Sequence, residues 1–477
     1  MAVERVIIHT LTLYCVACVL LLQIHTAASS TFGAESTAKE VSLKAADATA
    51  LRTTPRDWSD VLKDLPVGCS RLDIGGSLRY RFEHQDDFNV KLYADPKFSS
   101  DDFVLQRFRL DFNLRLREDS RAYVELQDSR PFGVNFSKHD FMLGCPYWDY
   151  LDLRQAYVER LPGDGSPLGF KIGRQAIFYA DNRVWGPGEW GNVGRYTWDA
   201  AKLIVDVPPA RIDFIFGDRV KYHPAGFDGD HYQFHTYGVY ATLKELPFRV
   251  DLFYIKKESH GNYVIGSHGE TVDLDISSFG FYVDGKLRRR WDYRGTFAHT
   301  FGMRDHATVE AYGASARLGY TFDVPWKLRI GAEFSYGSGD PNPGSGRYQT
   351  FDGLFGAVDI TYGRMNLFSW KNLHDYQVSL GIKPTKELGV SLDWHFFRLD
   401  KAKDAWYYGN GRPQRQDPTG AAGTELGQEI DLTAKYKCSE QLDLQAGYAH
   451  FFPGTFIRRT GPSRDADWAF AQLVYRY

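Results

Sequence analysis

The sequence lacks long apolar runs beyond its N-terminus and has no strong excess of charge of either sign. Past residue 28, no segment of the 477-residue chain approaches the roughly 20 consecutive apolar residues that a membrane-spanning helix needs. The formal net charge of −3 gives no global attraction to a polyanion such as nucleic acid. After residue 70 no linker or change of composition divides the chain, so one large domain is expected.

Cysteine is scarce, and its five residues are Cys15, Cys18, Cys69, Cys145 and Cys438. The first two lie in an N-terminal apolar run that is expected to be removed. The other three are an odd number without the spacing of metal ligands, which argues against a disulfide framework and against a zinc site. A bridge between Cys69 and Cys438 stays open, because the topology predicted below places both at the same end of the strands.

The segment from Phe103 to Arg117 shows what the sequence does contain. From position 107 on, odd positions are polar or charged and the even positions between them are apolar. The polar positions are Arg107, Arg109, Asp111, Asn113, Arg115 and Arg117, and the apolar positions are Phe108, Leu110, Phe112, Leu114 and Leu116. A strict period of two predicts a strand. Four arginines on one face suit a strand between lipid and a water-filled lumen, whereas an edge strand of a soluble sheet is the alternative for this segment alone.

The alternation recurs along the chain, at residues 78–83, 211–216, 328–336 and 429–436. The connections alternate between short ones, near 118–120, 161–167, 208–209, 244–247, 287–290, 323–325, 384–387 and 438–440, and long ones, near 85–102, 130–149, 178–198, 218–232, 258–274, 302–307, 338–373, 400–426 and 452–465. An apparent extra strand near 355–363 breaks the parity and is assigned to a loop. The fold class predicted is all-β, a transmembrane outer-membrane β-barrel of about 18 antiparallel strands with short periplasmic turns and long extracellular loops.

The N-terminus predicts three regions. A basic start, an apolar run and small residues near Ala27 and Ala28 indicate a signal peptide over 1–28, with a permanent anchor helix as the alternative. Residues 29–69 are read as a flexible periplasmic extension in which RDWSDVLKDL forms a short helix. Residues 70–477 are the predicted barrel. Its last segment ends LVYRY, which resembles the C-terminal signal that the barrel-assembly machinery reads.

The stretch GRQAIFYADNRVWGPGEWGNVGRYTWDA, residues 173–200, resembles the signature of the alginate export porin family of bacterial outer membranes. Weaker matches are LRQAYV from Leu153, GQEIDL from Gly427 and GYAHFFPG from Gly447. The stretch departs from the family pattern at Ala180, where glycine is usual. The resemblance implies an eighteen-stranded monomeric barrel with an arginine-rich constriction.

The candidate substrate path consists of basic residues expected to face the lumen. They are Arg79, Arg81, Arg107, Arg109, Arg115, Arg117, Arg174, Arg183 and Arg195, with Asp111, Asp181 and Asp199 as acidic partners. Guanidinium groups bind carboxylates in a planar fork and stay charged at any relevant pH, so a ladder of them can pass a polyuronate along. The acids would hold the arginines extended and keep each contact weak. Structural ion pairs that fill the lumen are the alternative.

The loop from Phe178 to Trp198 is long, rich in glycine and aromatic residues, and external in this topology. Folded into the lumen, it would narrow the channel. Its aromatic residues would stack on sugar rings or, alternatively, form an interfacial girdle; they are Tyr179, Trp185, Trp190, Tyr196 and Trp198.

Catalysis and cofactors find little support. His299, His395 and His450 lie on expected strands, but no serine or acid lies at a spacing that marks a triad, so an outer-membrane barrel enzyme is the least favoured function. No cofactor or resident metal is expected. Calcium in the outer loops is an alternative to ordinary turns at three aspartates, Asp228, Asp230 and Asp340.

The sequence therefore predicts a porin for passive, anion-selective passage of an acidic polysaccharide or oligosaccharide, and not an enzyme. A general porin for small organic anions or sugars is the alternative. The expected partners are outer-membrane lipid, the acidic cargo, the barrel-assembly machinery and, for an exporter, a periplasmic export scaffold.

Overall fold

The structure is a computed structural model that describes residues 58–477 apart from 89–99, 136–145, 164, 195, 225, 229–231, 266–269, 357–358, 360 and 410. The chain divides into two compact units, Met1–Ile74 and Gly75–Tyr477. In the described residues no helix is long and apolar enough to cross a membrane.

The second unit is built almost entirely of strands. The strands of the barrel are β2 (Ser70–Asp86), β3 (Ser100–Arg115), β4 (Ser120–Phe132), β5 (Asp149–Arg160), β6 (Leu168–Gln175), β7 (Trp198–Val207), β8 (Ala210–Val220), β9 (Tyr232–Leu243), β10 (Arg249–Ile265), β11 (Thr271–Leu287), β12 (Trp291–Arg304), β13 (Ala307–Thr321), β14 (Arg329–Gly337), β16 (Leu373–Ile382), β17 (Leu388–Arg398), β20 (Glu425–Lys437), β21 (Leu442–Pro453) and β22 (Ala466–Arg476). Short elements in the loops are β15 (Arg347–Tyr348), β18 (Trp406–Tyr407), β19 (Pro413–Arg415) and α2 (Thr455–Thr460).

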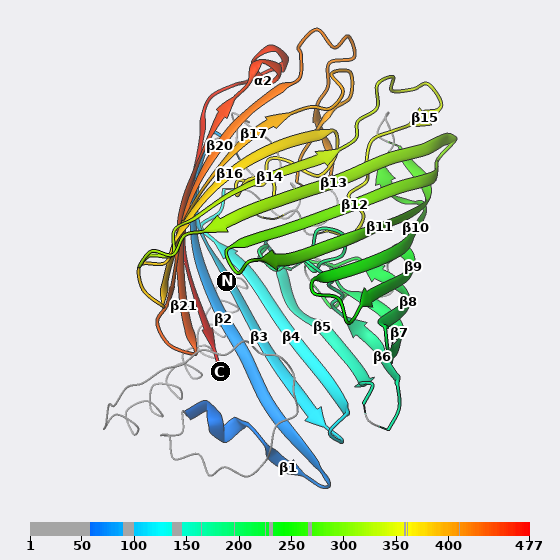
Figure 1. Cartoon of the computed structure of the whole chain (residues 1–477), viewed down its shortest axis with the longest axis vertical. Coiled ribbons are helices and arrows are strands. Elements are labelled where there is room, and N and C mark those ends of the chain that lie inside the picture. The colour runs from blue at the N-terminus through cyan, green and yellow to red at the C-terminus, as the bar shows by residue number, and fades with distance from the viewer. Residues whose placement is uncertain are drawn as a thin grey trace, which may run out of the picture. The chain divides into compact units, whose positions relative to one another are not determined.

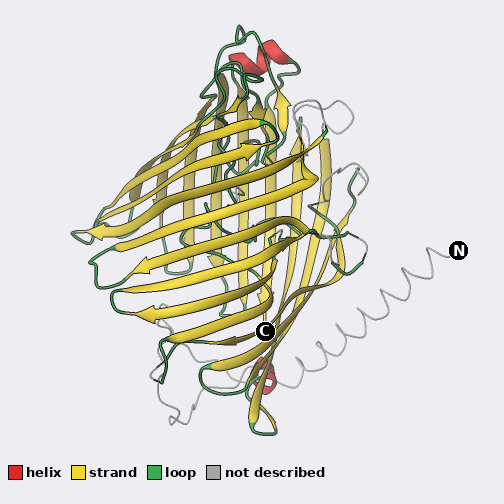
Figure 2. Cartoon of the chain, turned by 90° about the vertical axis from the view of Figure 1, so that its right-hand side faces the viewer, coloured by secondary structure: helices red, strands yellow, loops and turns green. Residues whose placement is uncertain are grey.

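The eighteen strands of the described residues form a closed antiparallel barrel. Each strand pairs with the barrel strands before and after it, and the first pairs with the last from Ser77↔Arg476 to Asp86↔Asp467. Figures 1 and 2 show the strands side by side in one continuous wall. The predicted fold class is confirmed, since the alternation along the chain is the pattern of strands with two different faces.

The connections at one end of the barrel are short, as the sequence predicts. They comprise 116–119, 161–167, 208–209, 244–248, 288–290, 322–328, 383–387 and 438–441. At the other end, the prediction of long loops near 258–274 and 302–307 is wrong. The strands β10 and β11 extend into the region 258–274, and β12 joins β13 through the two-residue turn Asp305–His306, in which Asp305 has a φ of 51°. The described residues of 355–363 form no barrel strand, as expected.

The two faces of the strands differ in polarity. On β20, Leu432 and Tyr436 are 47% and 46% exposed on the outside, whereas Glu429 and Asp431 are 0% and 1% exposed inside. Apolar side chains exposed around the wall are what lipid requires, because hydrocarbon solvates them and water does not. Residues Phe108, Leu110 and Phe112 lie half-buried on the outer face of β3, opposite the inward Arg107 and Arg109.

Two long loops fold into the barrel and bring apolar side chains with them. The first inward loop, residues 176–197, joins β6 to β7, and the second inward loop, residues 338–372, joins β14 to β16. They are joined by two backbone hydrogen bonds, from Phe355 N to Val184 O (3.1 Å) and from Gly186 N to Phe355 O (3.1 Å). Trp185 and Phe355 are 0% and 1% exposed. The interior is therefore partly filled by loops and is not an open tube.

The described part of the first unit is small. It contains a 3₁₀ helix, η1 (Trp58–Leu62), within the predicted helical segment, and a strand, β1 (Leu65–Val67), that turns back onto the start of β2. Cys69 and Cys438 are both free and exposed, so the alternative of a bridge between them is not realised. Cys145 and the predicted signal peptide lie outside the described residues.

Candidate functional site: an arginine cluster beneath the first inward loop

The first inward loop turns into the barrel through residues in unusual backbone conformations. Gly188 and Gly194 have φ values of 69° and 68°, and Ala180 and Asn182 have values of 53° and 66°. Glycine adopts this left-handed region without steric cost, and asparagine tolerates it. Alanine pays a steric cost in this region, so Ala180 is strained with its φ of 53°. This strain gives a physical reason why glycine is usual at this position in the family that the stretch resembles.

The loop is held at its start by aromatic contacts. Tyr179 stacks on Tyr240 of β9 with ring centroids 3.8 Å apart, and its hydroxyl donates to Asp213 of β8 at 2.6 Å. Trp185 packs against Trp198 and Phe355, with ring centroids 5.8 Å and 5.6 Å away. A Cβ at Gly238 would come within 2.8 Å of the Trp185 ring, so this glycine makes room for the loop.

Two arginines of β2 bind the backbone of the loop. Arg79 donates to the carbonyl oxygens of Trp190 (3.1 Å) and Gly191 (3.0 Å), and Arg81 donates to that of Trp190 (2.8 Å). Both side chains are only 3% exposed. The Arg81 guanidinium also lies 4.4 Å from the centroid of the Trp190 ring. Arg79 and Arg81 thus face inward as predicted, and their guanidinium N–H groups donate to carbonyl oxygens of the first inward loop.

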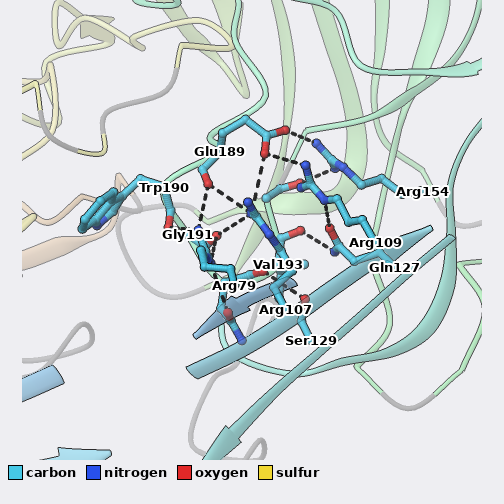
Figure 3. Close-up of polar contacts among 12 residues, drawn as sticks. Arg79, Arg107, Arg109, Gln127, Ser129, Arg154, Glu189, Trp190, Gly191 and Val193 are labelled. Carbon is cyan, nitrogen blue, oxygen red and sulfur yellow. Dashed lines mark hydrogen bonds and ion pairs between the residues drawn. The ribbon is translucent and has the colours of Figure 1, made fainter. Parts of the chain in front are cut away.

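Three further arginines converge on the Glu189 carboxylate (Figure 3). Arg109 of β3 lies 2.8 Å from Glu189 Oε2, and Arg107 lies 3.6 Å from the same oxygen. Arg154 of β5 pairs with Glu189 Oε1 and donates to Gly194 O at 2.8 Å. We refer to Arg79, Arg81, Arg107, Arg109 and Arg154 as the arginine cluster. One loop carboxylate therefore bridges several guanidinium groups of the wall.

Neighbouring polar groups fix the geometry of the cluster. Gln127 of β4 accepts from Arg109 Nε at 2.7 Å and donates to Val193 O at 2.7 Å. Glu125 lies 3.0 Å from Arg154 Nε. A Cβ at Gly194 would come within 3.0 Å of Arg109 Nη2, so a glycine lets the guanidinium groups approach the loop closely.

The charge of the cluster is only partly balanced. Partial desolvation of the carboxylate inside the barrel would raise the pKa of Glu189, but the charges of Arg109, Arg154 and Arg107 outweigh it and hold that pKa well below its ordinary value. Nη2 of Arg109 and Nε of Arg107 are buried without a hydrogen-bond acceptor in the described residues. The Glu189 side chain is 46% exposed, so the shared carboxylate lies within reach of the water-filled space.

Arg174 and Arg183 lie outside the arginine cluster and have partners of their own. Arg174 pairs with both oxygens of Asp199, at 2.8 and 2.9 Å. Arg183 of the first inward loop pairs with Glu333 of β14 and lies 3.6 Å from Asp181. Two of the expected acidic partners therefore do hold arginines.

The remaining predicted residues of the path are scattered. Arg115 ends β3 and Arg117 lies in the following turn, where both are exposed and far along the strand from the arginine cluster. Asp111 lies opposite Glu125 in the pairing of β3 with β4. Arg195 is outside the described residues.

The aromatic residues of the loop are used mainly in packing. Trp185 and Trp198 are fully buried at 0% exposure, so their rings contact protein in this structure, and stacking on sugar rings stays a prediction. Trp190 packs edge-on against Phe470 at 5.1 Å, and Tyr196 lies under the Arg219 guanidinium at 4.3 Å. Their neighbours are protein groups because the loop itself occupies the interior.

Sequence reasoning missed Glu189 and Arg154 as members of the site. Glu189 lies in an irregular loop, where no periodicity shows the direction of a side chain. Arg154 lies in a quoted family motif, but its strand pairs irregularly: Glu125 faces Gln155 and Leu126 faces Leu153, so one residue of β5 is extra. The alternation that marks inward residues elsewhere is broken there.

Comparisons with known proteins agree with this architecture. A family model described as "Alginate export" matches residues 70–471. No curated protein matches the chain. Among solved structures, OccK11 (OpdR) of Pseudomonas aeruginosa has a TM-score of 0.54 at 14% identity, covering 85% of this chain and 95% of that one. OccAB2 of Acinetobacter baumannii has a TM-score of 0.54 at 12% identity, covering 85% and 98%. At such identities the likeness concerns the fold alone.

Proposed function

This chain belongs to the alginate export family, and we propose that it is an anion-selective outer-membrane channel that passes an acidic polysaccharide or oligosaccharide through the arginine cluster. The family and the barrel fold together indicate an outer-membrane channel. The anion selectivity and the polyuronate cargo are the proposal. The observation that carries it is the convergence of Arg107, Arg109 and Arg154 on a single carboxylate.

The Glu189 carboxylate marks where a carboxylate of the cargo would bind. A uronate chain carries about one carboxylate per sugar, and a guanidinium group binds it in the geometry seen with Glu189. In this proposal the cargo carboxylates compete with Glu189 and displace the first inward loop from the wall. Release stays easy because groups of the wall still contact the arginines: Glu125 lies beside Arg154, and Gln127 accepts from Arg109.

The test is conductance of the refolded protein in planar bilayers, with oligouronates and neutral oligosaccharides added as blockers. The double variant Arg107→Gln with Arg109→Gln should lose anion preference and weaken block by oligouronates about 5- to 30-fold, that is, about 1–2 kcal/mol for two partly screened charges. High salt should mimic the effect in the wild-type channel. Block of the channel by neutral sugars should hardly change in the double variant.

A matched control removes the same charge outside the cluster. The double variant Arg115→Gln with Arg117→Gln alters exposed residues at the short-turn end of the barrel and should keep most of the block. The proposal is wrong if the cluster variant keeps its anion preference, or if neutral oligosaccharides block the wild-type channel as well as charged ones do.

A general porin for small organic anions is the second candidate, because the two inward loops are tied together inside the barrel. A lumen narrowed in this way suits small solutes better than a polymer. Dependence of block on oligouronate length separates the two functions. Block that strengthens with each added sugar favours the polysaccharide, whereas equal block by monomer and oligomer favours the small anion.

The proposal includes the route to the membrane. The signal peptide at 1–28 would direct export across the inner membrane, and the extension 29–69 would face the periplasm, where a scaffold could hand over the polymer. Edman sequencing of the mature protein checks the cleavage after residue 28.

A further inference from the structure

Three carboxylates from separate parts of the chain meet at the long-loop end of the barrel. Asp149 and Asp152 belong to β5, and Asp228 lies in the connection between β8 and β9. One oxygen of each carboxylate lies within 4.8 Å of the other two. Asp149 and Asp152 are buried, at 2% and 3% exposure, and Asp228 is half-buried. We refer to these residues as the acidic trio.

A bulge in β5 brings two members of the trio to the same face. Residues three apart on a regular strand point to opposite faces. Here Gln127 faces Asp152 and Ser129 faces Asp149. The chain of β5 therefore advances three positions where β4 advances two, so β5 contains one extra residue. Leu151 absorbs the extra residue with a φ of 28° and points outward, at 54% exposure. Both carboxylates therefore face the interior.

One oxygen of the trio is buried without a partner among the described residues. Asp149 Oδ2 accepts from Gln127 Nε2 at 3.1 Å, but no donor in the described part of the chain reaches Asp149 Oδ1. A buried carboxylate oxygen without a donor is costly, and such an atom calls for an ion or a water molecule. Asp152 Oδ1 accepts the backbone N–H of Asp228 at 2.9 Å, which holds the third carboxylate close to the first two.

The negative charge of the trio has no direct cationic partner among the residues that the structure describes. In the described part of the chain, none of the three carboxylates forms a salt bridge; the nearby Arg174 pairs with Asp199 and donates to the carbonyl oxygen of Asp228 at 3.1 Å. Three carboxylates so close together, two of them buried, favour an added positive charge between them.

We propose that Asp149, Asp152 and Asp228 bind a calcium ion that ties the connection between β8 and β9 to β5. The ligands are all oxygen, which excludes metals that prefer nitrogen or sulfur. Calcium accepts oxygens at about 2.3–2.6 Å, so two ligands of one ion lie up to about 5 Å apart, as in the trio. Magnesium keeps more of its water and usually takes one or two carboxylates. This site is independent of the proposed cargo.

The experiment uses the full mature chain refolded in detergent without lipopolysaccharide, treated with a chelator and then titrated with calcium chloride by calorimetry. The wild-type protein should bind one calcium ion. Asp228→Asn and Asp152→Asn should each weaken binding at least 10-fold. Asp323→Asn, which alters an exposed aspartate in the turn between β13 and β14, should bind calcium as the wild type does.

Electrophoresis in dodecyl sulfate, with and without heating, checks the folding of each variant: a band that shifts on heating as the wild-type band does indicates a folded barrel. If Asp152→Asn fails to fold, Asp228→Asn, which lies in a loop, carries the test. Absence of calcium binding by the wild type up to about 10 mM, ten times the Kd of about 1 mM at the weakest extracellular sites, overturns the proposal. Unchanged affinity in the folded trio variants also overturns it, since the ion then binds elsewhere. Magnesium binding of equal strength overturns the assignment to calcium.

Discussion

At the scale of single residues, Glu189 joins the first inward loop to the wall of the barrel. Its carboxylate pairs with Arg109 and Arg154, and its carbonyl oxygen accepts from Arg107 at 3.1 Å. Hydrogen bonds to charged groups are typically worth about 1.5–3 kcal/mol, less where water screens them. Removing this one charge should therefore loosen the loop without unfolding the barrel.

The pH dependence of the channel follows from the lowered pKa of Glu189. A carboxylate whose pKa is lowered in the closed loop stabilises closure fully above its ordinary pKa of about 4.3, and that stabilisation is lost as the pH falls through the lowered value. Single-channel conductance should therefore stay constant from about pH 8 to pH 5 and rise only in more acidic solution.

The variant Glu189→Gln serves as the control for this prediction. It should show higher conductance at neutral pH and a smaller rise in acid, because the titrating group is gone. Wild-type opening between about pH 5 and pH 7 would instead assign the gate to a group other than Glu189, whose ordinary pKa lies below that range.

At the scale of elements, the two inward loops behave as one packed unit inside the barrel. Trp185 of the first loop contacts Phe355 of the second and Trp198 at the start of β7. The second loop is in turn fixed to the wall, where Lys257 of β10 lies 2.5 Å from Asp352. The loops thus depend on each other for their position.

Replacing Trp185 with alanine should release both loops. Removing a fully buried tryptophan costs about 3–5 kcal/mol, and the loss falls on the loops because the wall keeps its hydrogen bonds. Planar-bilayer recordings should show a larger and noisier conductance, while the band shift on heating stays that of a folded barrel. The exposed Trp326 in the turn 322–328 gives the control variant Trp326→Ala, which should conduct as the wild type does. Unchanged conductance in Trp185→Ala would show that the loops hold their place without this ring.

At the scale of the whole molecule, the barrel depends on the pairing of its first and last strands. Tyr475 pairs with Leu78 and Arg476 with Ser77. The backbones of Tyr477 and Gly76 exchange two hydrogen bonds, of 3.1 and 3.2 Å. An open barrel would expose unpaired backbone groups to lipid, which costs several kcal/mol for each group.

Deleting Tyr475–Tyr477 should prevent assembly. The deletion removes the last pairs of the closing seam and the terminal aromatic residues that resemble the assembly signal. Cell fractionation should find the truncated protein absent from the outer membrane. Tyr477→Phe, which keeps an aromatic residue and the backbone pairing, should assemble normally. Wild-type levels of the truncated chain in the outer membrane would contradict both the seam and the signal.

The sequence by itself determined the barrel and the direction of most strand residues. Alternation is a local property, since neighbouring residues of a strand point to opposite faces whatever the rest of the chain does. It therefore placed Arg79, Arg81, Arg107 and Arg109 inside. Connection lengths are local as well, and their alternation predicted the number of strands.

Only the tertiary structure decided what those inward residues bind. The partners of Arg79 and Arg107 come from a loop 80 or more residues away in the chain, and Glu189 has no periodic pattern around it that shows its direction. The sequence did not show that Arg154 points inward, or that Asp149 and Asp152 lie on the same face of β5. The reason is that β5 contains bulges, and a single extra residue reverses the alternation of the side chains. The burial of Trp185 and Trp198 likewise follows from where the loops lie. A strand pattern shows the face of a residue, but its partners depend on how the closed barrel and its inward loops pack together.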